Sequence, residues 1–83
     1  MNNFTLYEIE FKTDGQIDLL EIAKNFSSEA EIDCYNRSTS RITIRLVSGL
    51  TKTQMINLCD DFKIEIESNT NARLIYKVSS ITL

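Results

Sequence analysis

Several residue types are missing from this chain or scarce in it, and each shortage narrows the chemistry that the chain can perform. Histidine, proline and tryptophan are absent, and there are two glycines and two cysteines among 83 residues. Without histidine, the chain lacks the side chain that most often transfers protons near neutral pH and most often binds transition metals. The lack of proline and the scarcity of glycine leave no obvious linker, so we expect residues 1–83 to form a single domain.

Long apolar runs are also absent. No stretch is long enough to cross a membrane, and no basic-then-apolar leader opens the sequence, so we expect a cytoplasmic chain without membrane contact. In that compartment Cys34 and Cys59 are expected to be reduced core residues, with a disulfide between them as the alternative.

Motifs for catalysis and cofactor binding are missing too. The sequence contains no P-loop and no dinucleotide-binding fingerprint, and its serines have no histidine to activate them. Carboxylates are paired at positions 8 and 10, 60 and 61, and 65 and 67, but no other reactive side chain converges on them. We therefore expect no enzyme, no cofactor and no metal, with adventitious cation binding by a carboxylate pair left open.

Charge is present but unevenly distributed. The formal net charge is −3, residues 1–33 carry a net charge of −6, and residues 37–52 carry +4. A nucleic-acid-binding domain usually presents a basic surface, which this composition lacks overall. We therefore do not expect nucleic acid as a partner.

Hydrophobic periodicity predicts five strands and two helices. The strands are expected at residues 4–12, 30–36, 41–47, 63–67 and 73–79. Apolar stripes with i, i+3, i+4, i+7 spacing predict helices at residues 19–26 and 55–62, preceded by possible capping boxes at Thr13/Gln16 and Thr51/Gln54. This order predicts an α+β fold, a ferredoxin-like βαββαβ plait with an added C-terminal strand, sheet order 5-4-1-3-2 and both helices on one face.

Strict alternation assigns side chains to the two faces of this sheet, and residues 41–47 form its clearest strand. The helix-facing side chains would be Tyr7, Ile9, Phe11, Ile32, Cys34, Ile42, Ile44, Leu46, Ile64, Ile66, Leu74, Tyr76 and Val78. The open face would carry the charges of Glu8, Glu10, Asp33, Arg41, Arg45, Glu65, Glu67, Arg73 and Lys77. Exposed apolar side chains would share that face: Phe4, Leu6, Tyr35, Val47 and Ile75.

This composition allows two interpretations of the open face. It is either a solvated surface whose opposite charges pair across strands, or a surface that docks on another protein. We favour a non-enzymatic protein-binding module, similar in size and charge to phage-encoded inhibitors such as anti-CRISPR proteins, and a homodimer through an edge strand or the open face is also possible. The predicted partner-binding residues are Leu6, Glu8, Tyr35, Arg41, Arg45 and Ile75.

One segment resembles a known family: residues 7–24, YEIEFKTDGQIDLLEIAK. It is similar to the start of an ACT domain, with a strand, an Asp-x-x-Gly-type turn and a helix with a Leu-x-x-Ile-like core. The resemblance implies a sensor of amino acids or other small effectors. The residues lining such a site would be Asp14, Gly15, Gln16 and Ile17. The turn is shorter than the family's and lacks its usual proline, and the alternative is that Gly15 only permits a tight turn.

Overall fold

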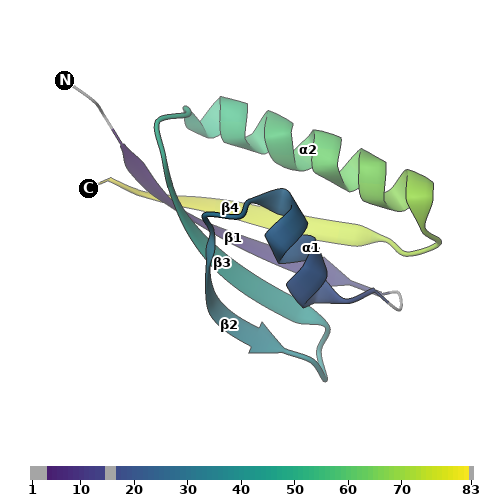
Figure 1. Cartoon of the computed structure of the whole chain (residues 1–83). Helices are drawn as coiled ribbons and strands as arrows, with labels where there is room; N and C mark the ends of the chain where they lie inside the picture. The colour runs from purple at the N-terminus through teal and green to yellow at the C-terminus, as the bar shows by residue number, and fades with distance from the viewer. Residues whose placement is uncertain (1–3, 15–16, 83) are drawn as a thin grey trace.

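The computed structural model describes residues 4–14 and 17–82, with Thr82 described by its backbone alone, and these residues form a small α+β domain (Figure 1). Its elements are β1 (Thr5–Thr13), α1 (Leu19–Phe26), β2 (Glu31–Asn36), β3 (Arg41–Ser48), α2 (Lys52–Asn69) and β4 (Leu74–Thr82). The four strands form one antiparallel sheet in the order β2-β3-β1-β4. The predicted pairing of the first strand with the third, and of the second with the third, is confirmed.

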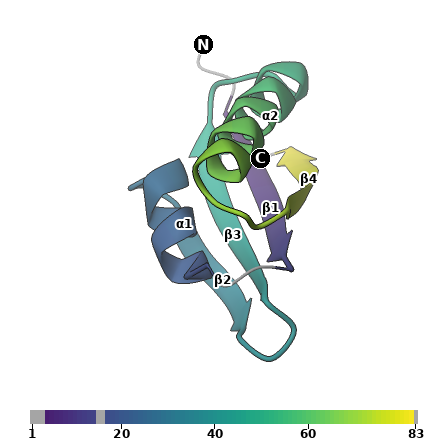
Figure 2. The same cartoon turned by 90° about the vertical axis from the view of Figure 1, so that its right-hand side faces the viewer.

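Both helices lie on the same face of the sheet, as predicted (Figures 1 and 2). Phe11 of β1 contacts Phe26 of α1 and Phe62 of α2, with ring centroids 5.3 and 5.8 Å apart. Phe26 and Phe62 also contact each other, at 5.2 Å. Edge-to-face aromatic pairs contribute roughly 0.5–1.5 kcal/mol each beyond the area that they bury. This trio therefore joins the two helices to each other and to the sheet.

The strand predicted at residues 63–67 is wrong, because these residues belong to α2. The capping box of Thr51 and Gln54 is confirmed, and the helix that it begins runs on to Asn69. No glycine or proline interrupts the chain after Phe62, so nothing in the local sequence ends the helix there. Consequently Ile66 packs against the core while Ile64 is 63% exposed.

The sheet therefore has four strands in the described residues, and the strand predicted fifth in the chain, here β4, pairs directly with β1. The glutamates at positions 65 and 67 are on α2 instead of the sheet. Asp60 and Asp61 lie in the middle of this long helix. The helix dipole disfavours acidic side chains only near the C-terminal end, so it does not destabilise them here.

The capping box predicted at Thr13 and Gln16 is also wrong. Helix α1 begins at Leu19, and its N-cap is Asp18, whose carboxylate accepts a hydrogen bond from the backbone N–H of Leu20 at 3.0 Å. Thr13 is the last residue of β1, and its hydroxyl donates to the carbonyl of Arg73 at 2.9 Å. Gln16 lies outside the described residues.

A β-bulge in β2 changes the predicted orientation of two side chains. Ile32 is opposite Ile44 of β3, but the register shifts at Asp33, so Cys34 is opposite Thr43 and Tyr35 is opposite Ile42. Because the extra residue moves all later side chains to the other face, Tyr35 points to the helix side and Cys34 to the open side. The predictions of an inward Cys34 and an open-face Tyr35 are therefore wrong.

Candidate functional site

The open face of the sheet is the candidate site, because both helices cover the opposite face. Buried Tyr7, Ile9 and Phe11 alternate along β1 with outward side chains, and buried Ile42, Ile44 and Leu46 do the same along β3. The outward side chains of the two central strands are Leu6, Glu8, Glu10, Lys12, Arg41, Thr43, Arg45 and Val47. This period-2 pattern is the one predicted for both strands.

Charged residues in the middle of the open face pair across strands. Arg41 lies 3.6 Å from Glu10, and Arg45 lies 3.8 Å from Glu8 and 3.5 Å from Asp33. All five side chains are between one third and one half exposed. Exposed pairs of this kind contribute at most about 1 kcal/mol each, so they keep the face polar without adding much to stability. Cross-strand charge pairing is confirmed for β1, β2 and β3.

A row of apolar side chains crosses the open face beside these charges. Leu6 of β1 is opposite Val47 of β3 on one side and Ile81 of β4 on the other. Val47 and Ile81 are 51% and 49% exposed. Next to this row is a hollow of about 350 Å³, lined by Leu6, Glu29, Glu31, Arg45, Leu46 and Val47. We call Leu6, Val47 and Ile81 the apolar row.

Five of the six predicted partner-binding residues share the open face. Leu6, Glu8 and Arg45 are close together, while Arg41 and Ile75 are both opposite Lys12 near the other end of β1, where Ile75 is 62% exposed. The sixth, Tyr35, is on the helix side because of the bulge. Ile81 was not among the predicted site residues. The strand was expected to end at residue 79, and no residue in the sequence marks that β4 continues to Thr82.

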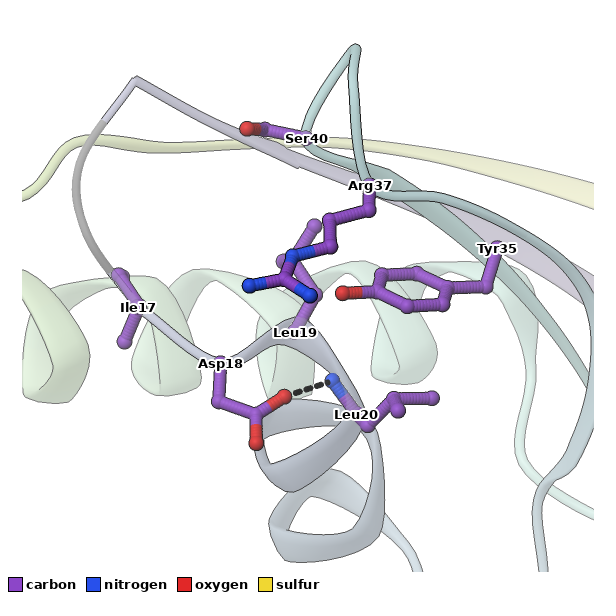
Figure 3. Close-up of a pocket in the computed structure, with 7 residues that line it drawn as sticks. All are labelled: Ile17, Asp18, Leu19, Leu20, Tyr35, Arg37 and Ser40. Carbon is purple, nitrogen blue, oxygen red and sulfur yellow. Dashed lines mark hydrogen bonds between the residues drawn. The ribbon is translucent and has the colours of Figure 1, made fainter.

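A second hollow, of about 620 Å³, lies at the start of α1 (Figure 3). Its lining residues are Ile17, Asp18, Leu19, Leu20, Tyr35, Arg37 and Ser40. Figure 3 shows the hydroxyl of Tyr35 directed toward the guanidinium of Arg37 above the first turn of the helix. Ser40 has φ of 52°, in the left-handed region, and its carbonyl accepts a hydrogen bond from the N–H of Thr13 at 3.1 Å.

The residues predicted from the ACT resemblance are only partly near this hollow. Ile17 lines it, whereas Asp14 lines a separate hollow of about 400 Å³ beside β4. Asp14 is bound to the start of β4, because its carboxylate accepts from the N–H of Arg73 at 2.9 Å and its own N–H donates to the carbonyl of Arg73 at 3.4 Å. Gly15 and Gln16 lie outside the described residues.

Two titratable side chains have shifted pKa values, and both are near α2. Burial raises the pKa of the Cys59 thiol to about 12, with a smaller contribution from the charge of Asp60. The hydrogen bond that the Tyr76 hydroxyl donates to the Asp60 carboxylate raises the pKa of Tyr76 to about 12. Cys59 is buried and Cys34 is exposed, and neither forms a disulfide. The prediction of a core position is thus confirmed for Cys59 alone.

In the part of the chain that the structure describes, no group of three histidine, cysteine or acidic side chains is placed to hold a metal ion. No helix in the same residues is long and apolar enough to span a membrane. No protein-family model, curated protein or solved structure matches this chain. Its function must therefore be inferred from its own residues.

Proposed function

We propose that this chain is a non-enzymatic protein-binding module of the cytoplasm, an inhibitor or regulator that docks on another protein through the open face of its sheet. The observation that supports this most is the apolar row of Leu6, Val47 and Ile81, which lies next to the ion pair of Arg45 with Glu8 and in which Val47 and Ile81 are about half exposed. Protein interfaces commonly combine an apolar centre with a polar rim.

The arrangement of charges supports the same proposal. Arg45 is shared by Glu8 and Asp33, and all three side chains remain partly exposed. A partner can therefore form additional hydrogen bonds to these groups without first breaking buried pairs, and charged rims of this kind contribute to specificity and association rate. Arginine is also enriched at protein interfaces. The roles that we assign are anchoring to Leu6, Val47 and Ile81, and recognition to Glu8, Arg41 and Arg45.

We also infer the finer fold assignment from the strand order. The order β2-β3-β1-β4 with both helices on one face corresponds to a ferredoxin-like plait without an added strand. That architecture leaves one sheet face open, which is the surface that we propose for docking.

The docking proposal can be tested with two matched variants. Val47→Asp places a charge in the apolar row, and Ile64→Asp places the same charge on α2, away from the open face, at a residue that is similarly exposed. Immobilised wild-type chain and the Ile64→Asp variant should retain the same protein from a cell extract, and Val47→Asp should lose it. A protein retained equally by all three, or none retained by the wild type, would contradict the proposal.

The hollow at the start of α1 supports a second candidate function, an ACT-like small-molecule sensor. Arg37 could bind a ligand carboxylate, the Tyr35 hydroxyl could donate or accept a hydrogen bond, and Leu20 supplies an apolar wall. An amino acid combines the groups that such a site would recognise.

Thermal unfolding with each amino acid in turn tests this alternative. A ligand present at 100 times its Kd adds about 2.7 kcal/mol to the free energy of unfolding, which for a domain of this size raises Tm by roughly 10–20 °C. The shift should disappear in Arg37→Ala and persist in Arg73→Ala, which removes a cation from a different hollow. No shift with any amino acid would rule out amino-acid sensing.

A further inference from the structure

Strand β4 forms one edge of the sheet, and its backbone directions can be assigned. The N–H of Asp14 donates to the carbonyl of Arg73, one position beyond the ends of the two strands. Counting from this pair, every second pair between β1 and β4, beginning with Lys12 and Ile75, is therefore a hydrogen-bonded pair. The N–H and C=O groups of Ile75, Lys77, Ser79 and Ile81 therefore point toward β1. Those of Tyr76, Val78 and Ser80 point away from it, toward the rim of the sheet.

The hydrogen bond of the Leu74 N–H is consistent with these backbone directions. This N–H belongs to the outward set, and it donates to the carboxylate of Glu67 at 2.9 Å instead of to β1. The outward groups of Tyr76, Val78 and Ser80 face the rim, where none of the described elements lies beyond β4. Figure 2 places β4 at the right-hand rim of the sheet. These three residues are thus a template for one more strand.

The two edges of the sheet are protected to different extents. The opposite edge, β2, has six residues, a bulge, and two acidic side chains, Glu31 and Asp33. Strand β4 has nine residues in continuous register with β1, and Lys77 is its single charged residue. Bulges, charges and shortness are the devices by which sheets avoid edge-to-edge association, so β4 is the edge suited to pairing.

We propose that a second copy of this chain pairs with β4 in antiparallel orientation, with the two-fold axis at Val78. This register places Tyr76 opposite Ser80 of the second copy and Lys77 opposite Ser79 of the second copy. It also places Ile75, 62% exposed, opposite Ile81 of the second copy, 49% exposed. Because of the two-fold symmetry, this pair of isoleucines occurs at two places in the dimer.

Neighbouring registers are less favourable. An axis at Lys77 would place two lysines directly opposite each other, and like charges at such positions are destabilising. An axis at Tyr76 would place Ile75 opposite Lys77, and an axis at Ser79 would place Ile81 opposite Lys77. Of the registers centred on residues 76 to 80, only the one at Val78 pairs the two isoleucines. The sequence of β4 is therefore self-complementary.

This association leaves the open face accessible. A two-fold axis perpendicular to the sheet keeps the helices of both copies on one side, so the two open faces join into one eight-stranded surface. The proposed docking residues Leu6, Val47, Glu8, Arg41 and Arg45 lie on β1 and β3, away from the rim of β4, and Ile81 alone belongs to both surfaces. Self-association and docking are therefore tested separately by variants at residues that the two surfaces do not share, such as Val78 on β4 and Val47 on β3.

A proline in β4 tests the backbone pairing. Because the N–H of Val78 points outward, Val78→Pro removes hydrogen bonds of the proposed interface and none between β4 and β1. Light scattering over a range of concentrations should give twice the chain mass of 9.5 kDa for the wild type and for Val78→Ala. Val78→Pro, with an unchanged circular dichroism spectrum, should remain at 9.5 kDa.

A lysine at position 79 tests the register. Ser79 is opposite Glu8 within the sheet, so Ser79→Lys gains a favourable neighbour in the monomer but faces Lys77 of the second copy at two symmetric places. We expect the dimer dissociation constant to rise by roughly tenfold or more with no loss of thermal stability in the monomer. Ile64→Lys adds the same charge on α2 and should dimerise like the wild type.

Cross-linking provides a direct measurement. In a Cys34→Ser background, the double variant Ile75→Cys with Ile81→Cys should form a disulfide-linked dimer on oxidation. The two positions form a non-hydrogen-bonded pair between copies, with Cα atoms about 4.5 Å apart, within the range of a disulfide. Within one chain they are about 20 Å apart along the strand. The control Ile75→Cys with Ser79→Cys should cross-link poorly.

Three results would overturn the proposal. The first is a wild-type mass of 9.5 kDa at all concentrations up to the millimolar range. The second is a dimer that persists in both Val78→Pro and Ser79→Lys, which would place the interface elsewhere. The third is equal cross-linking by the two cysteine pairs, which would exclude the register.

Discussion

Replacing Ile64 and Ile66 by alanine, one at a time, distinguishes the two conformations that the sequence of residues 63–67 allows. In a strand the two side chains would share a face and would contribute similar stability. In α2 they are about 200° apart around the helix axis. Ile64 is accordingly 63% exposed, whereas Ile66 packs against the hydrophobic core.

The expected losses follow from this difference in burial. Removing a fully buried isoleucine side chain costs 2–5 kcal/mol, so for the partly buried Ile66 we expect a loss of about 2 kcal/mol in the free energy of unfolding. Ile64→Ala removes little packing and gains helix propensity, so its effect should stay within about 0.5 kcal/mol. In Tm, these values correspond to a fall of roughly 8–16 °C for Ile66→Ala and less than about 4 °C for Ile64→Ala.

Urea unfolding followed by circular dichroism, at one fixed protein concentration, measures both values. The fixed concentration matters because self-association would add to the apparent stability. Equal losses in the two variants, or a larger loss for Ile64→Ala, would refute the helical assignment and with it the four-stranded sheet.

Three further predictions concern charge, thiol reactivity and pH. Arg45→Ala removes exposed ion pairs, so it should lower the free energy of unfolding by less than about 1 kcal/mol, and salt titration should abolish the difference. A thiol reagent should modify Cys34 in the folded chain and Cys59 only after unfolding, because Cys59 is buried and its pKa is raised to about 12. Mass spectrometry after labelling would count the modified thiols, and two modified thiols in the folded chain would contradict this prediction. Tyr76 has a folded pKa of about 12 against an ordinary value of 10.0, so its contribution to stability is complete below pH 10 and is lost as pH rises toward 12. Thermal melts across this range should show a shallower fall for Tyr76→Phe, with the remaining fall due to Cys59, and an unchanged slope would contradict the hydrogen bond to Asp60.

Much of this fold can be predicted from local pattern. Strict alternation in β1 and β3 specifies which side chains are buried, because hydrophobic residues recur at every second position in a strand that has one buried and one solvent-exposed face. The stripe of Leu19, Ile22, Ala23 and Phe26 identifies α1, and the capping box at Thr51 identifies the start of α2. These signals arise from contacts within a few residues of each other.

The wrong predictions about the fold arise where one local sequence pattern is compatible with two secondary structures. The sequence Lys63-Ile64-Glu65-Ile66-Glu67 alternates like a strand, but the same residues extend a helix that has already begun and that no glycine or proline ends. Tertiary packing of Ile66 decides between the two. The bulge at Asp33 has no sequence signature at all, and it alone accounts for the wrong orientation of Tyr35.

The candidate site is predictable to the same extent. Leu6, Glu8, Arg41 and Arg45 are on the two central strands, where alternation is reliable, and the structure places all four on the open face, with Leu6, Glu8 and Arg45 close together. Ile81 was missed as a site residue because the end of β4 depends on pairing with Thr5 and Leu6, which are far from it in sequence. The hollow at the start of α1 could not be predicted, because it needs the bulge to bring Tyr35 to the helix side.

The extra residue in β2 also limits how large any assembly can become. If β4 of one molecule meets β4 of another, the outermost strand at each end is β2, whose kinked backbone and acidic side chains offer no straight template to a third molecule. Growth would therefore stop at a closed pair and not continue into a fibril. The inserted residue, together with the acidic side chains of β2, thus favours a finite complex over an open-ended aggregate.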